Sequence, residues 1–174
     1  MNLADEITIE APAAHVWDIL AHRFAEVGSW ATAITASSAI EAAGYVSGAP
    51  VAGRACETGV RLAPRVEETI VAYDEVARTL SYLGAGLPSF VASARNHWRV
   101  SAIGAERCIV RAEATVVTRG LAGRTLGPLI GLQLRSTGKA FLQDLKHYAE
   151  EGKPSPRKRR QLESRESAAS RPRR

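Results

Sequence analysis

The sequence predicts an α+β domain in which a curved antiparallel sheet of six to seven strands surrounds a long C-terminal helix. From residue 34 to about residue 119, β-type runs alternate with turns and no helical period is sustained. After Gly120 the apolar residues recur every three or four positions, which is the period of an amphipathic helix. The chain has 174 residues, the size of one ordinary domain.

The first strand is expected over residues 3–10, where Leu3, Asp5, Ile7 and Ile9 share one face. Ala11 and Pro12 end this strand, and proline is well suited to the first turn of a helix. A short helical insertion should follow, because apolar residues then recur at helical spacing. These are Val16, Ile19, Leu20, Phe24 and Val27.

The meander should contain strands near residues 34–42, 53–59, 65–74, 78–84, 90–102 and 107–119. The last helix is marked by Leu126, Leu129, Ile130, Leu134, Phe141, Leu142, Leu145 and Tyr148. We expect an interruption near Pro128 and an end at Gly152, which Lys153 and Pro154 follow.

These elements can bury their apolar faces only against one another, which predicts a helix-grip fold with the last helix lying across the concave sheet. Several inward positions of the predicted strands hold small residues: Ala92, Ala94, Ala112 and Ala114. A strongly curved sheet with small inward residues is difficult to fill with side chains. The sequence therefore predicts an internal hydrophobic cavity.

Charge divides the chain into two parts. Residues 153–174 hold nine Lys or Arg against two Glu, a net charge of +7, which leaves the rest of the chain mildly acidic. This segment has almost no apolar residue with which to pack, so we expect a ligand-binding domain over residues 1–152 and a disordered basic tail over residues 153–174. A solvated tail is favoured over one that binds nucleic acid or an anionic membrane.

Several classes of protein have no support in the sequence. The N-terminus has acidic residues where a secretory signal needs basic ones, and no apolar run is long enough to span a membrane. Cys56 and Cys108 stand alone, which argues against a disulfide framework or a metal site. Motifs for nucleophilic hydrolysis, phosphoryl transfer or nicotinamide binding are missing, and no cofactor is implied. We expect a cytoplasmic protein.

The run from Phe90 to Val100 alternates clearly, and the parity of Phe90, Asn96 and Trp98 should face inward. Asn96 would then be a polar amide on an apolar wall, where it needs a partner. That partner is a ligand, a water molecule or Glu68, or the amide is satisfied by neighbouring backbone.

Glu68 shares its parity with Val66 and Ile70 and should also point into the cavity, where Arg54 can pair with it. Three roles remain open for this acid: a structural ion pair with Arg54, the orientation of a ligand, or catalysis as a general acid. The residues themselves do not choose among these roles.

Four aromatic residues are candidates for the cavity wall or for ordinary core: Trp30, Tyr82, Phe90 and Trp98. Two loops rich in glycine and proline, residues 59–64 and 84–89, lie at strand ends where a cavity mouth should open. We predict that these loops form the gate of the cavity.

Several short motifs in order resemble the SRPBCC superfamily, which contains START proteins, birch-pollen-allergen-like proteins and the polyketide cyclase/dehydrase and lipid-transport family. The opening Ile7-x-Ile9-x-Ala11-Pro12 is similar to the start of these proteins, residues 67–82 to their central hairpin, and residues 142–152 to their terminal helix. The pocket motif of the bacterial members of this superfamily and of plant abscisic-acid receptors is similar to three features of this chain: Gly53-Arg54, the loop 59–64 and the inward-facing Glu68.

The resemblance implies that the chain binds an apolar, partly oxygenated small molecule of the lipid, isoprenoid or aromatic polyketide type. The alternative is a cofactor-independent polyketide aromatase/cyclase or dehydratase that uses Glu68, Arg54 and Asn96 in the same cavity. Both functions share one set of candidate residues: Trp30, Arg54, Glu68, Tyr82, Phe90, Asn96 and Trp98. Whether the chain is an enzyme stays open at this stage.

Overall fold

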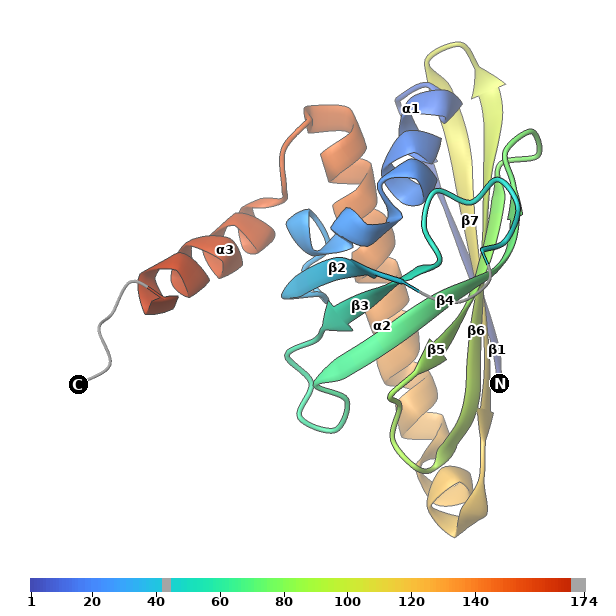
Figure 1. Cartoon of the computed structure of the whole chain (residues 1–174), viewed down its shortest axis with the longest axis vertical. Coiled ribbons are helices and arrows are strands. Elements are labelled where there is room, and N and C mark those ends of the chain that lie inside the picture. The colour runs from blue at the N-terminus through green and yellow to red at the C-terminus, as the bar shows by residue number, and fades with distance from the viewer. Residues whose placement is uncertain (42–44, 170–174) are drawn as a thin grey trace.

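The computed structural model describes residues 1–41 and 45–169 and shows a seven-stranded antiparallel sheet curved around a long helix (Figure 1). The strands are β1 (Asn2–Ile9), β2 (Ala36–Ile40), β3 (Gly53–Glu57), β4 (Arg65–Asp74), β5 (Thr79–Ala85), β6 (Val91–Gly104) and β7 (Arg107–Thr118). Their order is β1-β7-β6-β5-β4-β3-β2, so β1 and β2 form the two edges. The predicted fold class is confirmed.

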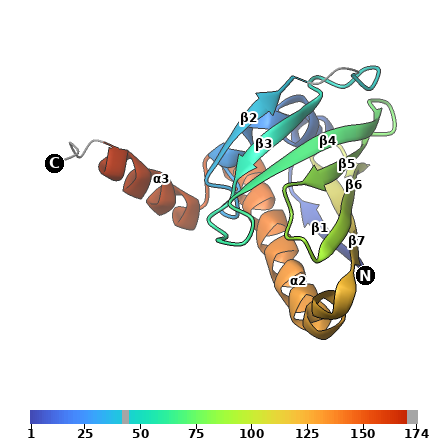
Figure 2. The ribbon, with the colours of Figure 1, turned by 60° about the horizontal axis from the view of Figure 1, so that its bottom comes forward.

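The helical insertion after β1 consists of three short pieces: α1 (Ala13–Trp17), a π-helical turn η1 (Asp18–His22) and a 3-10 turn η2 (Phe24–Ser29). The long helix α2 (Gly120–Glu151) lies against the concave side of the sheet (Figure 2). It continues through Pro128, where the sequence analysis expected an interruption. Gly152 ends it in the left-handed conformation, with φ of 66°, which glycine adopts without strain.

Parts of three predictions concern residues that the structure does not describe. Residue 42, at the end of the predicted strand 34–42, lies outside the described residues, as do residues 170–174 of the predicted tail. The side chains of Leu126, Leu129 and Ile130 in the predicted apolar stripe of α2 also lie outside the described part of the chain.

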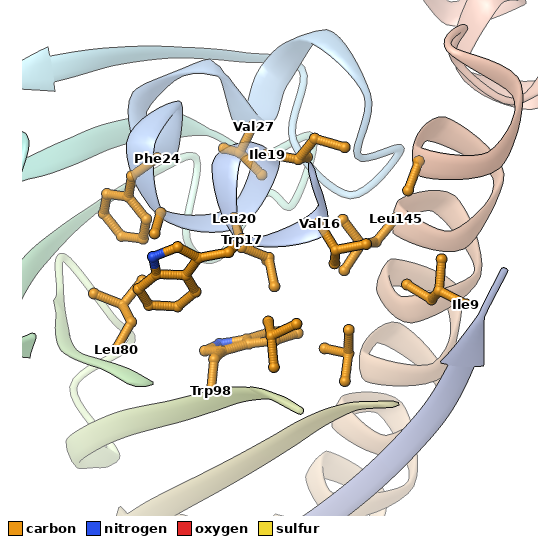
Figure 3. Packing of buried hydrophobic residues seen from close by; sticks show 14 of the residues in the cluster. Ile9, Val16, Trp17, Ile19, Leu20, Phe24, Val27, Leu80, Trp98 and Leu145 are labelled. Carbon is orange, nitrogen blue, oxygen red and sulfur yellow. The ribbon is translucent and has the colours of Figure 1, made fainter. Parts of the chain in front are cut away.

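The main hydrophobic core lies where the helical insertion meets the sheet and the C-terminal half of α2 (Figure 3). Trp17, Leu80 and Leu145 come from these three regions and are at most 1% exposed. Trp98 of β6 belongs to this core and also lines the space beyond it. The core thus fills one end of the curved sheet and leaves the other end to the site described below.

A polar contact fixes the helical insertion to the turn between β4 and β5. The Glu75 carboxylate accepts hydrogen bonds from Trp17 Nε1 at 2.9 Å and from the Tyr73 hydroxyl, and it lies 3.1 Å from His22 Nε2. These bonds, the one from Tyr73 first, lower the pKa of Glu75 to about 2. No spacing rule along the chain predicts this contact, because Trp17 and Glu75 are 58 residues apart.

The tail prediction is wrong for residues 156–169, which form helix α3 (Pro156–Ala169). The segment has few apolar residues, as the sequence indicates, but it docks through polar groups. Lys158 is fully buried, and its ammonium group donates to the backbone oxygen of Ile34 at 2.6 Å. Composition predicts whether a segment can form an apolar core, and it does not reveal hydrogen bonds to distant backbone. Beyond its docked first turns, α3 projects away from the sheet (Figure 1).

Candidate functional site

A cavity of about 540 Å³ lies between the concave face of the sheet and α2. Its volume is within the range of about 300–1,000 Å³ that is typical of small-molecule sites. Most of its wall is apolar, with contributions from Leu3, Val66, Ala94, Trp98, Ala112, Ala114, Val116, Leu134, Phe141 and Leu142. A pocket of this size thus lies where the sequence predicts the cavity, and its use as a hydrophobic ligand cavity stays a prediction.

Strand register explains which polar side chains enter this cavity. In an antiparallel sheet, paired residues point to the same face. Arg54 pairs with Glu68 across β3 and β4, and Tyr82 pairs with Asn96 across β5 and β6. All four residues line the cavity. The sheet thus places the predicted polar residues in two adjacent rows.

Gly53 allows β3 to approach β4 closely at the start of this arrangement. A Cβ atom at residue 53 would lie 2.2 Å from the backbone oxygen of Glu68, a distance that no real side chain tolerates. The glycine before Arg54 is therefore required by packing at this point of the sheet.

Arg54 and Glu68 form a buried ion pair. Arg54 Nε lies 2.5 Å from Glu68 Oε2, and the two side chains are 5% and 16% exposed. The guanidinium also donates to the Phe24 backbone oxygen at 2.9 Å and lies over the Phe24 ring, 3.9 Å from its centre. Burial has the largest single effect on the pKa of Arg54 and lowers it, but the neighbouring acidic groups, Glu68 first, together outweigh burial, so the pKa is raised. Arg54 is thus a fixed cation whose charge is already matched.

Tyr82 presents an oriented hydroxyl group to the cavity. Its ring is 4% exposed, and Trp98 Nε1 donates to its oxygen at 3.2 Å. Because the oxygen accepts this bond, the hydroxyl hydrogen must point elsewhere and can be donated to a guest. Burial, followed by the charge of Glu68, raises the pKa of Tyr82, so the phenol keeps its proton.

Asn96 is half-buried on the cavity wall, between Tyr82 of β5 and Ala114 of β7 in the register. Among the described residues, no side-chain hydrogen bond joins its amide to another group. Its amide can both donate and accept, so it can pair with a hydroxyl or a carbonyl group of a guest. The inward orientation predicted for Asn96 agrees with its place in the cavity wall.

Two of the aromatic candidates do not line the cavity. Trp30 is buried behind Phe141, with ring centres 4.7 Å apart, and it belongs to the core. Phe90 precedes β6 and lies outside the lining residues. A register shift between Val91 and Ser93 breaks the strict alternation there, so Ala92, expected to face inward, is exposed.

Other lining residues were not singled out as site candidates from the sequence. Cys56 shares the inward parity of Arg54, and burial raises the pKa of its thiol to about 11. Asp5 enters from β1, and its parity with Leu3 gave a usable signal. Arg135 and Arg157 also line the cavity. The sequence contains no pattern that places Arg157 in the cavity wall, because its position depends on how α3 docks on the domain.

The two predicted gate loops meet the cavity through apolar side chains. Val60 of the loop 59–64 and Leu87 of the loop 84–89 both belong to its lining. Val60 is 57% exposed, and its neighbour Leu62 is 71% exposed. The loops therefore stand at the mouth of the cavity, while their opening and closing stay a prediction.

Within residues 1–41 and 45–169, no group of three or more His, Cys, Asp or Glu side chains is arranged to hold a metal ion. Among the same residues, no helix combines the length and apolarity needed to cross a membrane.

The curved sheet, the enclosed helix and the lined cavity together define a protein of the helix-grip class. Residues 2–150 match the family described as polyketide cyclase / dehydrase and lipid transport, and the chain belongs to this family. The SRPBCC resemblance inferred from the sequence is thereby confirmed.

Solved structures with this fold include proteins of different kinds. The Zhui aromatase/cyclase from Streptomyces sp. R1128 is similar with a TM-score of 0.69 and 17% identity over 86% of this chain and 93% of that one. Ara h 8.0201 gives a TM-score of 0.66 with 16% identity over 86% and 97% of the two chains. A START superfamily protein from Mycobacterium smegmatis gives 0.61 with 11% identity over 84% and 97%. No curated protein has significant sequence similarity.

Proposed function

We propose that the chain binds an apolar, partly oxygenated small molecule, of the lipid, isoprenoid or aromatic polyketide type, in the cavity between the sheet and α2. The observation that carries the proposal is the combination of a 540 Å³ apolar cavity with a few polar groups on one wall. Family membership supports it, because the family description names cyclases, dehydrases and lipid transport.

The polar groups suggest how a guest is held. The Tyr82 hydroxyl is a donor whose direction is set by Trp98, and Asn96 is the register partner of this tyrosine on β6, with its amide free for a guest among the described residues. A carbonyl or hydroxyl oxygen of the guest can accept from both groups. Glu68 remains available as an acceptor through the oxygen that Arg54 does not use. An apolar guest with one oxygenated end fits this wall.

A neutral fluorescent probe, N-phenyl-1-naphthylamine, tests whether the cavity takes an apolar guest. Its emission should rise on binding, and Ala114→Phe should abolish the rise because the new ring fills the cavity. Thr115→Phe is the matched control, because Thr115 is the exposed neighbour on the outer face of the same strand. Equal binding by both variants, or no binding by the unchanged protein, would overturn the proposal.

Native mass spectrometry of protein purified from its own host would give the ligand class directly. A co-purifying small molecule should be displaced by the probe and should be missing from Ala114→Phe. A co-purifying molecule retained by Ala114→Phe would place binding outside this cavity.

The second candidate function is a polyketide aromatase/cyclase or dehydratase. Its specific support is the likeness to the Zhui aromatase/cyclase, together with an acid, a guanidinium and an amide in one cavity. Turnover of a poly-ketone thioester should disappear in Glu68→Gln and survive in Arg99→Ala, whose side chain is exposed. Turnover that is unchanged in Glu68→Gln would remove this residue from the chemistry.

A further inference from the structure

Helix α3 is attached to the segment that forms one side of the cavity. Lys158, which is 0% exposed, donates to the backbone oxygen of Ile34 at 2.6 Å and to Gln161 Oε1 at 2.9 Å. Gln161 Nε2 in turn donates to the backbone oxygen of Thr32 at 3.2 Å. Thr32 and Ile34 both line the cavity. The docked part of α3 is therefore continuous with the cavity wall.

A buried carboxylate joins α2 to the same segment and to the start of α3. Asp144, 8% exposed, accepts from the Thr32 backbone N–H at 2.7 Å through one oxygen and from the Ser155 hydroxyl at 2.9 Å through the other. Both oxygens of this acid are thus engaged. The beginning of α3 is fixed from two sides, which sets the position of its first exposed residues.

Arg157 is the residue that this docking brings to the cavity. Its side chain lines the cavity and is exposed, and within the described residues it has no hydrogen bond or ion pair. The charge of Arg54, deeper in the cavity, is already matched by Glu68. The other unmatched cation in the lining is Arg135 of α2. Unmatched positive charge therefore lies at the exposed part of the lining.

The acidic lining residues other than Glu68 come from the other side of the sheet. Asp5 belongs to β1 and Glu113 to β7, which lie at the opposite edge from β2 and β3. Arg111 already pairs with Glu113 at 2.8 Å. Arg157 therefore has no acidic partner in the described lining near its own segment. A guest that carries a negative charge can supply that partner.

We propose that Arg157 binds an anionic group of the guest at the rim of the cavity, so the ligand is an apolar molecule that bears a carboxylate. The inference rests on the proposed ligand-binding function and names the chemical class of the ligand. The carboxylate accepts hydrogen bonds from the guanidinium, whose planar fork matches its two oxygens. The apolar part of the same molecule lies between the sheet and α2.

A matched pair of probes tests the charge separately from the apolar body. These are 11-(dansylamino)undecanoic acid and its methyl ester, titrated by fluorescence into the full chain at pH 7. The unchanged protein should bind the acid more tightly than the ester. Arg157→Gln should weaken binding of the acid about two- to fivefold, within the range expected for one solvent-exposed ion pair, and should leave binding of the ester unchanged.

Two variants and one change of salt complete the design. Arg159→Gln removes an equal charge from an exposed residue of the same helix outside the lining, and it should leave both affinities unchanged. Arg135→Gln removes the other unmatched cation of the lining, and comparing its affinity for the acid with that of Arg157→Gln shows which arginine the acid contacts. Raising the salt from low to high concentration should reduce the preference for the acid, because an exposed ion pair is screened.

Several outcomes would overturn the inference. They are equal affinity of acid and ester for the unchanged protein, equal losses in Arg157→Gln and Arg159→Gln, or a loss that follows Arg135→Gln alone. If the ester and N-phenyl-1-naphthylamine bind while the acid has no advantage, ligand binding stands and the anion site fails. If none of the three probes binds, the proposed function itself fails.

Discussion

The ion pair between Arg54 and Glu68 gives a prediction whose size follows from burial. Replacing Glu68 with Gln leaves the Arg54 guanidinium, on a side chain that is 5% exposed, without its counter-charge. Breaking a buried pair in this way costs about 3–5 kcal/mol. The contacts with the Phe24 backbone oxygen and the Phe24 ring remain, and Gln can still accept a hydrogen bond. We therefore expect a loss at the lower end, about 3 kcal/mol.

The measurement is equilibrium unfolding in urea at pH 7, followed by tryptophan fluorescence. A loss of about 3 kcal/mol corresponds to a fall in the melting temperature of about 6–12 °C for a domain of this size. Glu67→Gln is the control, because Glu67 is the neighbouring acid, is 49% exposed and pairs only with exposed Arg65 in the described structure. It should change the free energy of unfolding by less than about 0.5 kcal/mol.

The double variant Arg54→Met, Glu68→Leu separates the cost of leaving one buried charge unpaired from the effect of losing the ion pair as a whole. Replacing both partners with apolar residues of similar size is often neutral, so this protein should be more stable than Glu68→Gln. Additive losses in the double variant, or a Glu68→Gln protein as stable as Glu67→Gln, would refute the claim that a desolvated charge dominates here.

Three other predictions concern stability. Burial is the main cause that lowers the pKa of Lys158 from 10.5 to about 8, so the unfolded chain keeps this proton up to a higher pH than the folded protein does. The free energy of unfolding, measured relative to that of Lys158→Met, should therefore rise between pH 8 and pH 10.5. A difference between the two proteins that stays constant over this interval would contradict the prediction. Glu75→Gln should cost about 1 kcal/mol at pH 7 because Glu75 is largely exposed. Hydrogen bonding, first from Tyr73, lowers the pKa of Glu75 from 4.5 to about 2, so this cost should vanish as pH falls through that interval; persistence at pH 2 would contradict it. Gly53→Ala should cost about 2–3 kcal/mol, because the new Cβ atom clashes with the Glu68 backbone oxygen. This cost corresponds to a fall in the melting temperature of about 4–12 °C. An unchanged melting temperature would show that β3 can move away from β4.

The sequence predicts the fold well because its signals are periodic and local. Alternation over residues 65–74 and 107–119 gives strands, and Gly152 with Pro154 gives the end of the long helix. The same alternation places Glu68 and Asn96 in the cavity, since paired strands carry their inward faces together. These inferences need only the period of a strand and the requirement for a shared core.

The failures occur where a long-range contact or a local irregularity decides the structure. A register shift beside Val91 removes Phe90 and Ala92 from the expected face, and strand period contains no sign of it. Trp30 has the same chemical character as Trp98, but it packs against Phe141, which lines the cavity, and is not itself a lining residue. Such differences depend on how α2 packs, which spacing along the chain does not determine.

Helix α3 shows that the composition of a charged segment does not predict whether the segment docks on the domain. A run of Lys and Arg is expected to be solvated, yet Lys158 is buried because the Ile34 carbonyl and Gln161 accept its hydrogens.

The buried ion pair bears directly on why these two residues are present in the cavity. A buried pair is weak evidence for stability, because apolar residues of similar volume often serve as well. The double variant Arg54→Met, Glu68→Leu should therefore fold, keep the apolar cavity and bind N-phenyl-1-naphthylamine with nearly unchanged affinity. It should bind an oxygenated ligand recovered from the native host less tightly, because the polar wall has been removed. Equal loss of both guests would mean that the pair only shapes the cavity, and equal retention of both would mean that the ligand does not contact it.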